Sequence, residues 1–153
     1  MPTAPTPFLW FDSQAEEAMN FYVSIFPRSK VGAVTRAQGR VMTVEFELDG
    51  QRFMGLNAGP QFTFNEAVSF FVGCDSQEEI DDLWAKLTAD GGEPGRCGWL
   101  KDRFGLSWQV VPNTLGRFMS GGGDPAASKR VMDAFFQMSK FEIAELQAAY
   151  DGT

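Results

Sequence analysis

One strand–helix unit occurs twice in this chain, and this repetition limits the possible folds more than any other feature. The first copy runs from Phe8 to Pro27, where a short aromatic strand is followed by Asp-Ser-Gln and an amphipathic helix. The second copy starts at Val68 with a hydrophobic strand, again followed by Asp-Ser-Gln and acidic residues. Any two strand–helix starts can look alike by chance, but the shared Asp-Ser-Gln with a following glutamate favours duplication.

Each copy also carries a signal for the first residue of its helix. Ser13 with Glu16, and Ser76 with Glu79, have the spacing of a capping box, in which the hydroxyl accepts from a free backbone N–H and the carboxylate reaches back. Pro27 is expected to end the first helix, and Gly91-Gly92 the second. We therefore predict two helices that start in the same way.

A hairpin in the first copy assigns its residues to two faces of a sheet. Asp49-Gly50 suits a two-residue type I′ turn, which sets Phe46 opposite Phe53. One face is then apolar and fit to pack on a helix, with Met42, Val44, Phe46 and Phe53. The other face is amphipathic, with Thr43, Glu45, Glu47, Arg52, Met54 and Leu56. Glu45 is expected near Arg52.

The second copy repeats this order after its helix, with strands over 95–100 and 106–112 and a tight turn near Lys101-Asp102. Trp108 takes the place of Phe53, and Gln109 that of Met54. The predicted fold class is α+β, with two βαβββ modules that form a curved mixed sheet and with C-terminal helices. We expect a single domain over 1–153, made of a first module at 5–60, a second at 66–119 and a helical appendage at 120–153.

The appendage is expected to hold two helices. Asp124-Pro125 provides an N-cap followed by proline at the first helical position, after a flexible Gly121-Gly122-Gly123. A last helix is expected from about Glu142, with Ile143, Leu146 and Tyr150 on its apolar side. Such apolar stripes cover either the domain's own sheet or a second chain, and both alternatives stay open.

The composition excludes several classes of function. The formal net charge of −7 opposes binding to a phosphate backbone, so nucleic acid is not an expected partner. Histidine is absent, which removes the usual general base and the commonest zinc ligand. No apolar run has the length of a membrane helix, and the N-terminus lacks signal-peptide character, so we expect a cytoplasmic protein without a membrane partner. Cys74 and Cys97 are expected to be buried free thiols rather than a disulfide.

Several strings in this order resemble the vicinal oxygen chelate superfamily, the glyoxalase and bleomycin-resistance fold, and most closely its PhnB-like branch. They are Pro7-Phe8-Leu9-Trp10-Phe11-Asp12, Ala18-Met19-Asn20-Phe21-Tyr22, Cys97-Gly98-Trp99-Leu100-Lys101-Asp102 and Phe104-Gly105-Leu106-Ser107-Trp108-Gln109. The resemblance covers roughly residues 5 to 120. It implies a homodimer, and it brings the label demethylubiquinone methyltransferase-like that such sequences often carry.

The resemblance also implies four inward-facing metal ligands in the metal-dependent members, usually His or Glu. The matching positions here are Gln109, Met54, Ser69 and a place near Pro5 to Pro7. An amide, a thioether and a hydroxyl would hold zinc, nickel or iron poorly. No Gly-rich turn leads from a strand into a helix, as a nucleotide-like methyl donor would require. We therefore predict no metal and no cofactor.

The remaining candidate is the concave face of the sheet. If the register is as predicted, this cup is lined by Leu9, Thr43, Glu45, Met54, Ser69, Phe71, Ser107 and Gln109. Such a lining suits a small, partly aromatic ligand held by one or two hydrogen bonds. The cup is alternatively filled by its own side chains. The prediction is a metal-independent small-molecule binding protein, with an enzyme of this superfamily as the alternative and Glu45 as its acidic candidate.

Because histidine is absent and the matching positions hold Met54, Ser69 and Gln109, the purified protein should carry no stoichiometric transition metal. Elemental analysis after dialysis against a weak chelator measures this directly. One zinc or nickel ion retained per chain would contradict the prediction.

Overall fold

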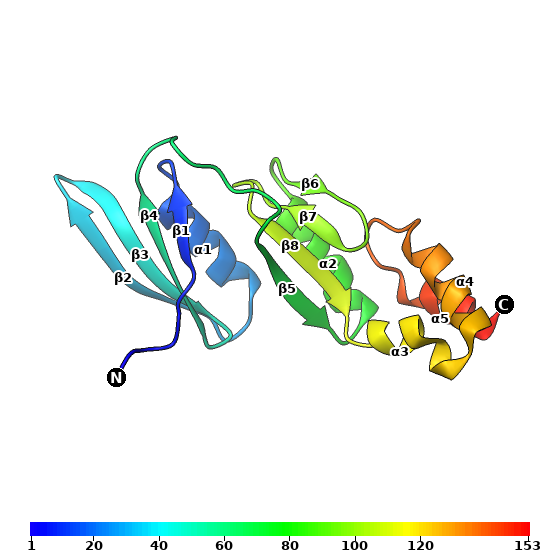
Figure 1. Cartoon of the computed structure of the whole chain (residues 1–153). Helices are drawn as coiled ribbons and strands as arrows, with labels where there is room; N and C mark the ends of the chain where they lie inside the picture. Colours follow the sequence, from blue (N-terminus) through cyan, green and yellow to red (C-terminus); the bar gives the residue numbers. More distant parts are fainter. The chain divides into compact units, whose positions relative to one another are not determined.

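The computed structural model describes all residues from Met1 to Thr153, and the chain forms two compact units, Met1–Phe64 and Asn65–Thr153. Each unit contains a four-stranded mixed sheet and a helix packed on one of its faces (Figure 1). The predicted α+β class with two modules and C-terminal helices is confirmed, and each module has its own sheet. No helix is long and apolar enough to cross a membrane.

The first unit consists of β1 (Phe8–Phe11), α1 (Ala15–Ile25), β2 (Lys30–Ala37), β3 (Arg40–Leu48) and β4 (Gln51–Asn57). Its strands lie in the order β1-β4-β3-β2, with β1 and β4 parallel and the other pairs antiparallel. The predicted hairpin register is confirmed, because Phe46 pairs with Phe53 and Glu47 with Arg52. Asp49 and Gly50 both have positive φ, at 48° and 84°, as a type I′ turn requires.

The predicted capping box at Ser13 is wrong. Helix α1 is preceded by Gln14, which makes no side-chain cap, and the Ala15 N–H donates instead to Asn57 Oδ1 at 2.8 Å. The amide nitrogen of Asn57 also donates to the Val41 carbonyl at 3.2 Å. A side chain from β4 therefore caps α1 and ties it to β3, a long-range contact that local sequence spacing does not reveal.

The second unit begins with β5 (Ser69–Cys74), α2 (Gln77–Thr88), β6 (Glu93–Pro94), β7 (Trp99–Lys101) and β8 (Ser107–Pro112). Its strand order β5-β8-β7-β6 repeats that of the first unit. Here the predicted cap is confirmed, since the Glu79 N–H donates to the Ser76 hydroxyl at 3.2 Å. The strand expected over 95–100 is wrong in its bounds, because residues 93–94 pair as β6 and β7 extends through Lys101.

The C-terminal segment folds into α3 (Leu115–Ser120), a 3₁₀ turn η1 (Gly121–Gly123), α4 (Pro125–Phe135) and α5 (Ile143–Asp151). The predicted Asp124 cap is confirmed, since its carboxylate accepts from the Ala126 N–H at 3.0 Å. Gly121-Gly122-Gly123 is not the expected linker, because it forms the 3₁₀ turn η1. A Cβ on Gly121 would lie 2.4 Å from the Ser128 nitrogen. The close approach requires glycine.

The apolar stripes of these helices are largely covered within the second unit. Phe118, Val131, Phe141 and Leu146 are buried, whereas Phe136 stays exposed. The Gln77 side chain joins the start of α2 to this segment through bonds to the Phe141 carbonyl and the Ile143 N–H. The helices therefore have a surface of their own to cover, and the homodimer stays a prediction.

The two cysteines are free, as predicted, but only Cys74 is buried and Cys97 is half-buried. Burial raises the pKa of the Cys74 thiol to about 11, with the nearby carboxylates of Glu79 and Asp75 as lesser causes. The Cys97 sulfur lies 3.5 Å from the Phe135 carbonyl.

A buried carboxylate organises the turn between β7 and β8. Asp102 is only 2% exposed, and its oxygens accept from the backbone N–H groups of Phe104 and Leu106, at 2.8 and 3.1 Å, and from Trp108 Nε1 at 2.9 Å. Each hydrogen bond to a charged group in such surroundings contributes about 1.5–3 kcal/mol. The turn and the buried indole of Trp108 therefore depend on one side chain.

We predict that Asp102→Asn lowers the free energy of unfolding by about 2–4 kcal/mol. The amide NH₂ of asparagine would face an N–H donor, either the Trp108 indole or the backbone, that the Asp102 carboxylate now accepts from. Asp82→Asn is the matched control, since Asp82 forms only an exposed pair with Lys86 and should cost less than about 0.5 kcal/mol. Urea unfolding of both variants measures the difference. Equal losses would show that the buried carboxylate has no special role.

Candidate functional site

In the first unit, the sheet face turned away from α1 carries one row of candidate residues. Glu45 pairs with Met54 across the hairpin, and Met54 is in register with Phe8 of β1. Thr43 lies in the next row, opposite Leu56. These side chains are half-buried except for the exposed Phe8. The predicted amphipathic face is therefore present, and its members Thr43, Glu45 and Met54 stand together.

The predicted position of Leu9 in this face is wrong. Leu9 is in register with Gly55, which pairs with Val44 on the face that packs against α1. Leu9 and Val44 are both buried there. Because side chains alternate along a strand, Phe8 takes the place that the sequence reading gave to Leu9. The predicted alternation of side chains in β1 is therefore displaced by one residue.

The expected proximity of Glu45 to Arg52 does not produce an ion pair. Arg52 lies opposite Glu47, and Glu47 is paired with Lys30 of β2 at 3.6 Å. A small depression of about 70 Å³ adjoins Glu45, bounded by Lys30, Gly32 and Arg52 among others. Glu45 is thus a carboxylate with basic groups nearby and no side-chain partner committed to it.

In the second unit, the face turned away from α2 carries a mixed row of apolar and polar side chains. Trp99 of β7 pairs with Gln109 of β8, which is in register with Phe71 of β5. The amide nitrogen of Gln109 donates to the Ser69 hydroxyl at 2.9 Å. Phe71 is 64% exposed, an unusual state for a large apolar side chain in a strand. Three predicted residues, Ser69, Phe71 and Gln109, therefore meet on this face.

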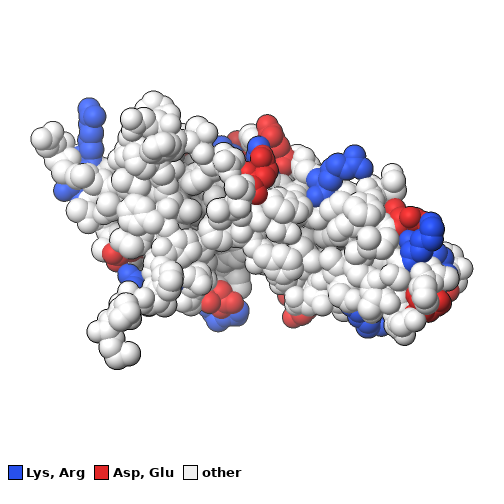
Figure 2. Space-filling model, in the orientation of Figure 1, with Lys and Arg blue, Asp and Glu red and all other residues white.

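The adjacent row on the same face is polar and borders a pocket. Glu93, Lys101, Ser107 and Ser69 follow one another across the four strands. The pocket has a volume of about 180 Å³ and is lined by Glu66, Glu93, Pro94, Gly95, Trp99, Leu100, Lys101 and Ser107. Figure 2 shows acidic and basic side chains together in the region of β6 and β7. Of the predicted site residues, Ser107 belongs to this pocket.

An ion pair closes one side of the pocket. The ammonium of Lys101 contacts the carboxylate of Glu66, which lies just before β5. This hydrogen bond lowers the pKa of Glu66 and raises the pKa of Lys101. The charge of Glu93 raises the pKa of Lys101 slightly further. Lys101 is therefore a cation held next to two carboxylates.

Sequence reasoning missed Glu66, Glu93, Trp99 and Lys101 as members of one pocket. The sequence pattern predicts a turn near Lys101 and makes no prediction for Glu93, because β6 has only two residues and β7 only three. Strands this short give no alternation to detect. One feature of the sequence does indicate the pairing. The connection between the strands that contain Trp99 and Ser107 is short enough for a hairpin, in which Lys101 pairs with Ser107.

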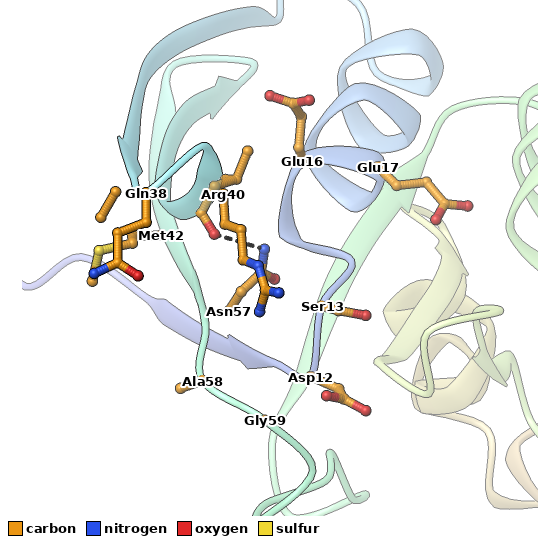
Figure 3. Close-up of a pocket in the computed structure, with 12 residues that line it drawn as sticks. Asp12, Ser13, Glu16, Glu17, Gln38, Arg40, Met42, Asn57, Ala58 and Gly59 are labelled. Atoms are coloured by element: carbon orange, nitrogen blue, oxygen red, sulfur yellow. Dashed lines mark hydrogen bonds between the residues drawn. The ribbon is translucent and has the colours of Figure 1, made fainter.

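A larger open hollow lies in the first unit, between the start of α1 and the β2–β3 turn (Figure 3). Its volume is about 1070 Å³, and Figure 3 shows the Arg40 side chain directed into it. Asn57 is committed to the cap of α1, and Glu16 is paired with Arg36 at 3.0 Å. The rim holds opposite charges, and none of the predicted site residues lies in it.

The residues at the positions matching the superfamily's metal ligands do not fit a metal. Ser69 and Gln109 are hydrogen-bonded to each other, and Met54 offers a thioether opposite Glu45. None of these groups is an anionic or imidazole ligand. The structure contains no group of three or more acidic or cysteine side chains placed to hold an ion. These positions suit hydrogen bonding and apolar contact instead.

Comparison with solved structures defines the class of fold. A glyoxalase/bleomycin resistance protein from Albidiferax ferrireducens matches with a TM-score of 0.50 and 15% identity, over 72% of this chain and 98% of that one. A fosfomycin resistance protein from Listeria monocytogenes, solved with Mn(II) and sulfate, matches with a TM-score of 0.56 and 12% identity, over 78% and 97%. The chain therefore has the glyoxalase/bleomycin-resistance fold.

The family is narrower than the fold. A putative 3-demethylubiquinone-9 3-methyltransferase, PhnB protein, from Bacillus cereus is 36% identical, with a TM-score of 0.67 over 72% of this chain and 99% of that one. The sequence profile of the 3-demethylubiquinone-9 3-methyltransferase family matches residues 3–111. The chain belongs to this PhnB-like family. No match was found among curated proteins.

The geometry of Glu45 leads to a prediction that separates a structural from a binding role. Because Glu45 has no ion-pair partner, Glu45→Gln should change the free energy of unfolding by less than about 0.5 kcal/mol. Urea unfolding without added ligand tests this, with Glu47→Gln as the paired comparison on the same strand. A loss above about 1 kcal/mol for Glu45→Gln alone would make the residue structural.

Proposed function

We propose that this PhnB-like protein binds a small organic molecule on the exposed sheet faces without a metal ion. The observation that supports this most directly is the group formed by Ser69, Gln109 and Phe71. It joins a hydrogen-bonded pair, which can offer further donors and acceptors, to an exposed aromatic ring. Ligand sites of this kind combine apolar surface with a few fixed polar groups.

In the proposed site, a hydrogen-bonded pair of side chains takes the place of a metal ion. The Gln109 amide donates one hydrogen to Ser69, and its second N–H and its carbonyl oxygen are available to a ligand. The Ser69 hydroxyl can still donate. The bond between them fixes the amide in position, which reduces the entropy that a ligand must overcome on binding. Glu45 and Met54 supply a comparable pairing of acid and apolar surface in the first unit.

The alternative is an enzyme of this superfamily, and the family description with its methyltransferase label favours it. The connections from β1 to α1 and from β5 to α2 contain Asp12-Ser13-Gln14 and Asp75-Ser76, rather than a glycine-rich turn that cradles a nucleotide-like donor. Transfer of a methyl group from S-adenosylmethionine to a demethylubiquinone analogue, followed by mass spectrometry, is the assay that would favour the enzyme.

The test of binding is a thermal-shift screen of small aromatic amines, alcohols and carboxylates in the presence of EDTA. We predict that at least one compound stabilises the wild type and that Gln109→Leu lowers its affinity about threefold to tenfold, the effect of one hydrogen bond. Gln137→Leu is the matched control, because Gln137 is exposed and outside this face. Stabilisation only after a divalent metal is added, or equal shifts in both variants, would contradict the proposal.

A further inference from the structure

The 180 Å³ pocket over β6 and β7 has an excess of negative charge. Glu66 and Glu93 contribute two carboxylates and Lys101 one ammonium, and the ammonium is held by Glu66. Glu93 faces Lys101 across β6 and β7 and acts on it through its charge, without a direct hydrogen bond or ion pair. The uncompensated charge at this position is therefore negative, and the net charge of the chain, −7, has the same sign. Both favour a cationic ligand over an anionic one.

The opposite side of the pocket carries a hydroxyl without a partner. Ser107 is 1% exposed, and its Oγ has no hydrogen bond in the structure. A buried polar group left unpaired costs about 1–3 kcal/mol, so native proteins rarely keep one without a reason. Ser107 is one of the residues that line the pocket, so its unpaired hydroxyl lies next to the space that a ligand would occupy. The hydroxyl can both donate to and accept from a bound molecule.

An aromatic side chain flanks the row formed by Glu93, Lys101 and Ser107, one row along β7 on the same face. Trp99 lines the pocket, and Gly95 stands in register beside it. A Cβ on Gly95 would lie 2.7 Å from the Trp99 carbonyl oxygen, so only glycine fits there. Glycine at this position lets the backbone of Gly95 approach that of Trp99 closely, and the Gly95 N–H donates to the Trp99 carbonyl at 2.8 Å. An indole offers both apolar contact and attraction for a cation.

The spacing of these groups sets the length of the ligand. Glu93 is on β6 and Ser107 on β8, with β7 between them. Two strand spacings correspond to about 9–10 Å. A molecule that satisfies both ends therefore carries its cationic group at one end and a hydrogen-bonding group at the other, with a compact apolar body between them.

We propose that this pocket binds a small aromatic amine that carries a hydroxyl, with its ammonium at Glu93, its ring beside Trp99 and its hydroxyl at Ser107. The inference rests on the proposed small-molecule function and specifies the class of ligand. In this assignment, Glu93, Lys101 and Ser107 select the ligand by its charge and its length. Lys101 remains neutralised by Glu66 and does not repel the amine strongly.

Four related probes test this assignment by calorimetric titration of the full chain. Tyramine has the ammonium and the hydroxyl, phenethylamine lacks the hydroxyl, tyrosol replaces the amine by an alcohol, and 4-hydroxyphenylacetate replaces it by a carboxylate. We expect tyramine to bind most tightly and 4-hydroxyphenylacetate least. Tyrosol or 4-hydroxyphenylacetate binding as tightly as tyramine would overturn the amine assignment while leaving small-molecule binding intact.

Two variants locate the ends of the ligand. Ser107→Ala should lower tyramine affinity about threefold to tenfold, to the level of phenethylamine, without changing phenethylamine binding. Its melting temperature without ligand should stay the same or rise, since an unpaired buried hydroxyl is removed. Glu93→Gln should weaken both amines and leave tyrosol unchanged.

The matched control for charge is Glu78→Gln, an exposed glutamate of α2 outside the pocket. It should leave the affinity for all four probes unchanged. An equal loss for Glu78→Gln and Glu93→Gln, or no effect of Ser107→Ala on tyramine, would overturn the assignment. Binding of none of the four probes would also overturn it, while the EDTA screen with Gln109→Leu decides the wider proposal separately.

Discussion

The candidate site of the second unit depends on the buried carboxylate of Asp102. By accepting from two backbone N–H groups and from the indole of Trp108, this side chain fixes the turn between β7 and β8. This turn determines that Lys101 pairs with Ser107 and Trp99 with Gln109. Because a shift of one residue exchanges the two faces of a strand, all four side chains lie on the face turned away from α2 only in this register.

In the first unit a backbone conformation takes the place of the carboxylate. Asp49 and Gly50 adopt positive φ values, and the two-residue turn aligns Glu45 with Met54. In both units the register directs the large apolar side chains toward a helix and leaves a mixed face outward. The two modules thus reach the same arrangement through different turns.

The sequence predicted those features that arise from local patterns. Asp49-Gly50 and the alternation around it gave the correct register of β3 and β4, and Ser76 with Glu79 gave the correct start of α2. The cap of α1 could not be predicted in this way, because it comes from Asn57, which lies 42 residues away from Ala15. Leu9 was placed on the wrong face because β1, with four residues, pairs with a strand distant in sequence. The pocket over β6 and β7 escaped detection for a similar reason.

The family description indicates an enzyme, whereas the side chains at the candidate site suit ligand binding. The profile match over residues 3–111 gives the family and carries a methyltransferase label, and the last helices α4 and α5 lie beyond it. The residues at the inherited metal positions, Met54, Ser69 and Gln109, are suited to neutral hydrogen bonding and apolar contact. The fold is that of the superfamily, and we propose that side-chain hydrogen bonds and apolar contacts bind the ligand in place of a metal.

The most direct test of this account is the side-chain amide resonance of Gln109 in a nitrogen-15 proton correlation spectrum. The account predicts that tyramine shifts this resonance and that EDTA leaves the shift unchanged, because Gln109 stands beside Trp99 on the face that binds the ligand. A resonance that moves only when a divalent metal is supplied, or that never moves while tyramine binds elsewhere, would contradict it.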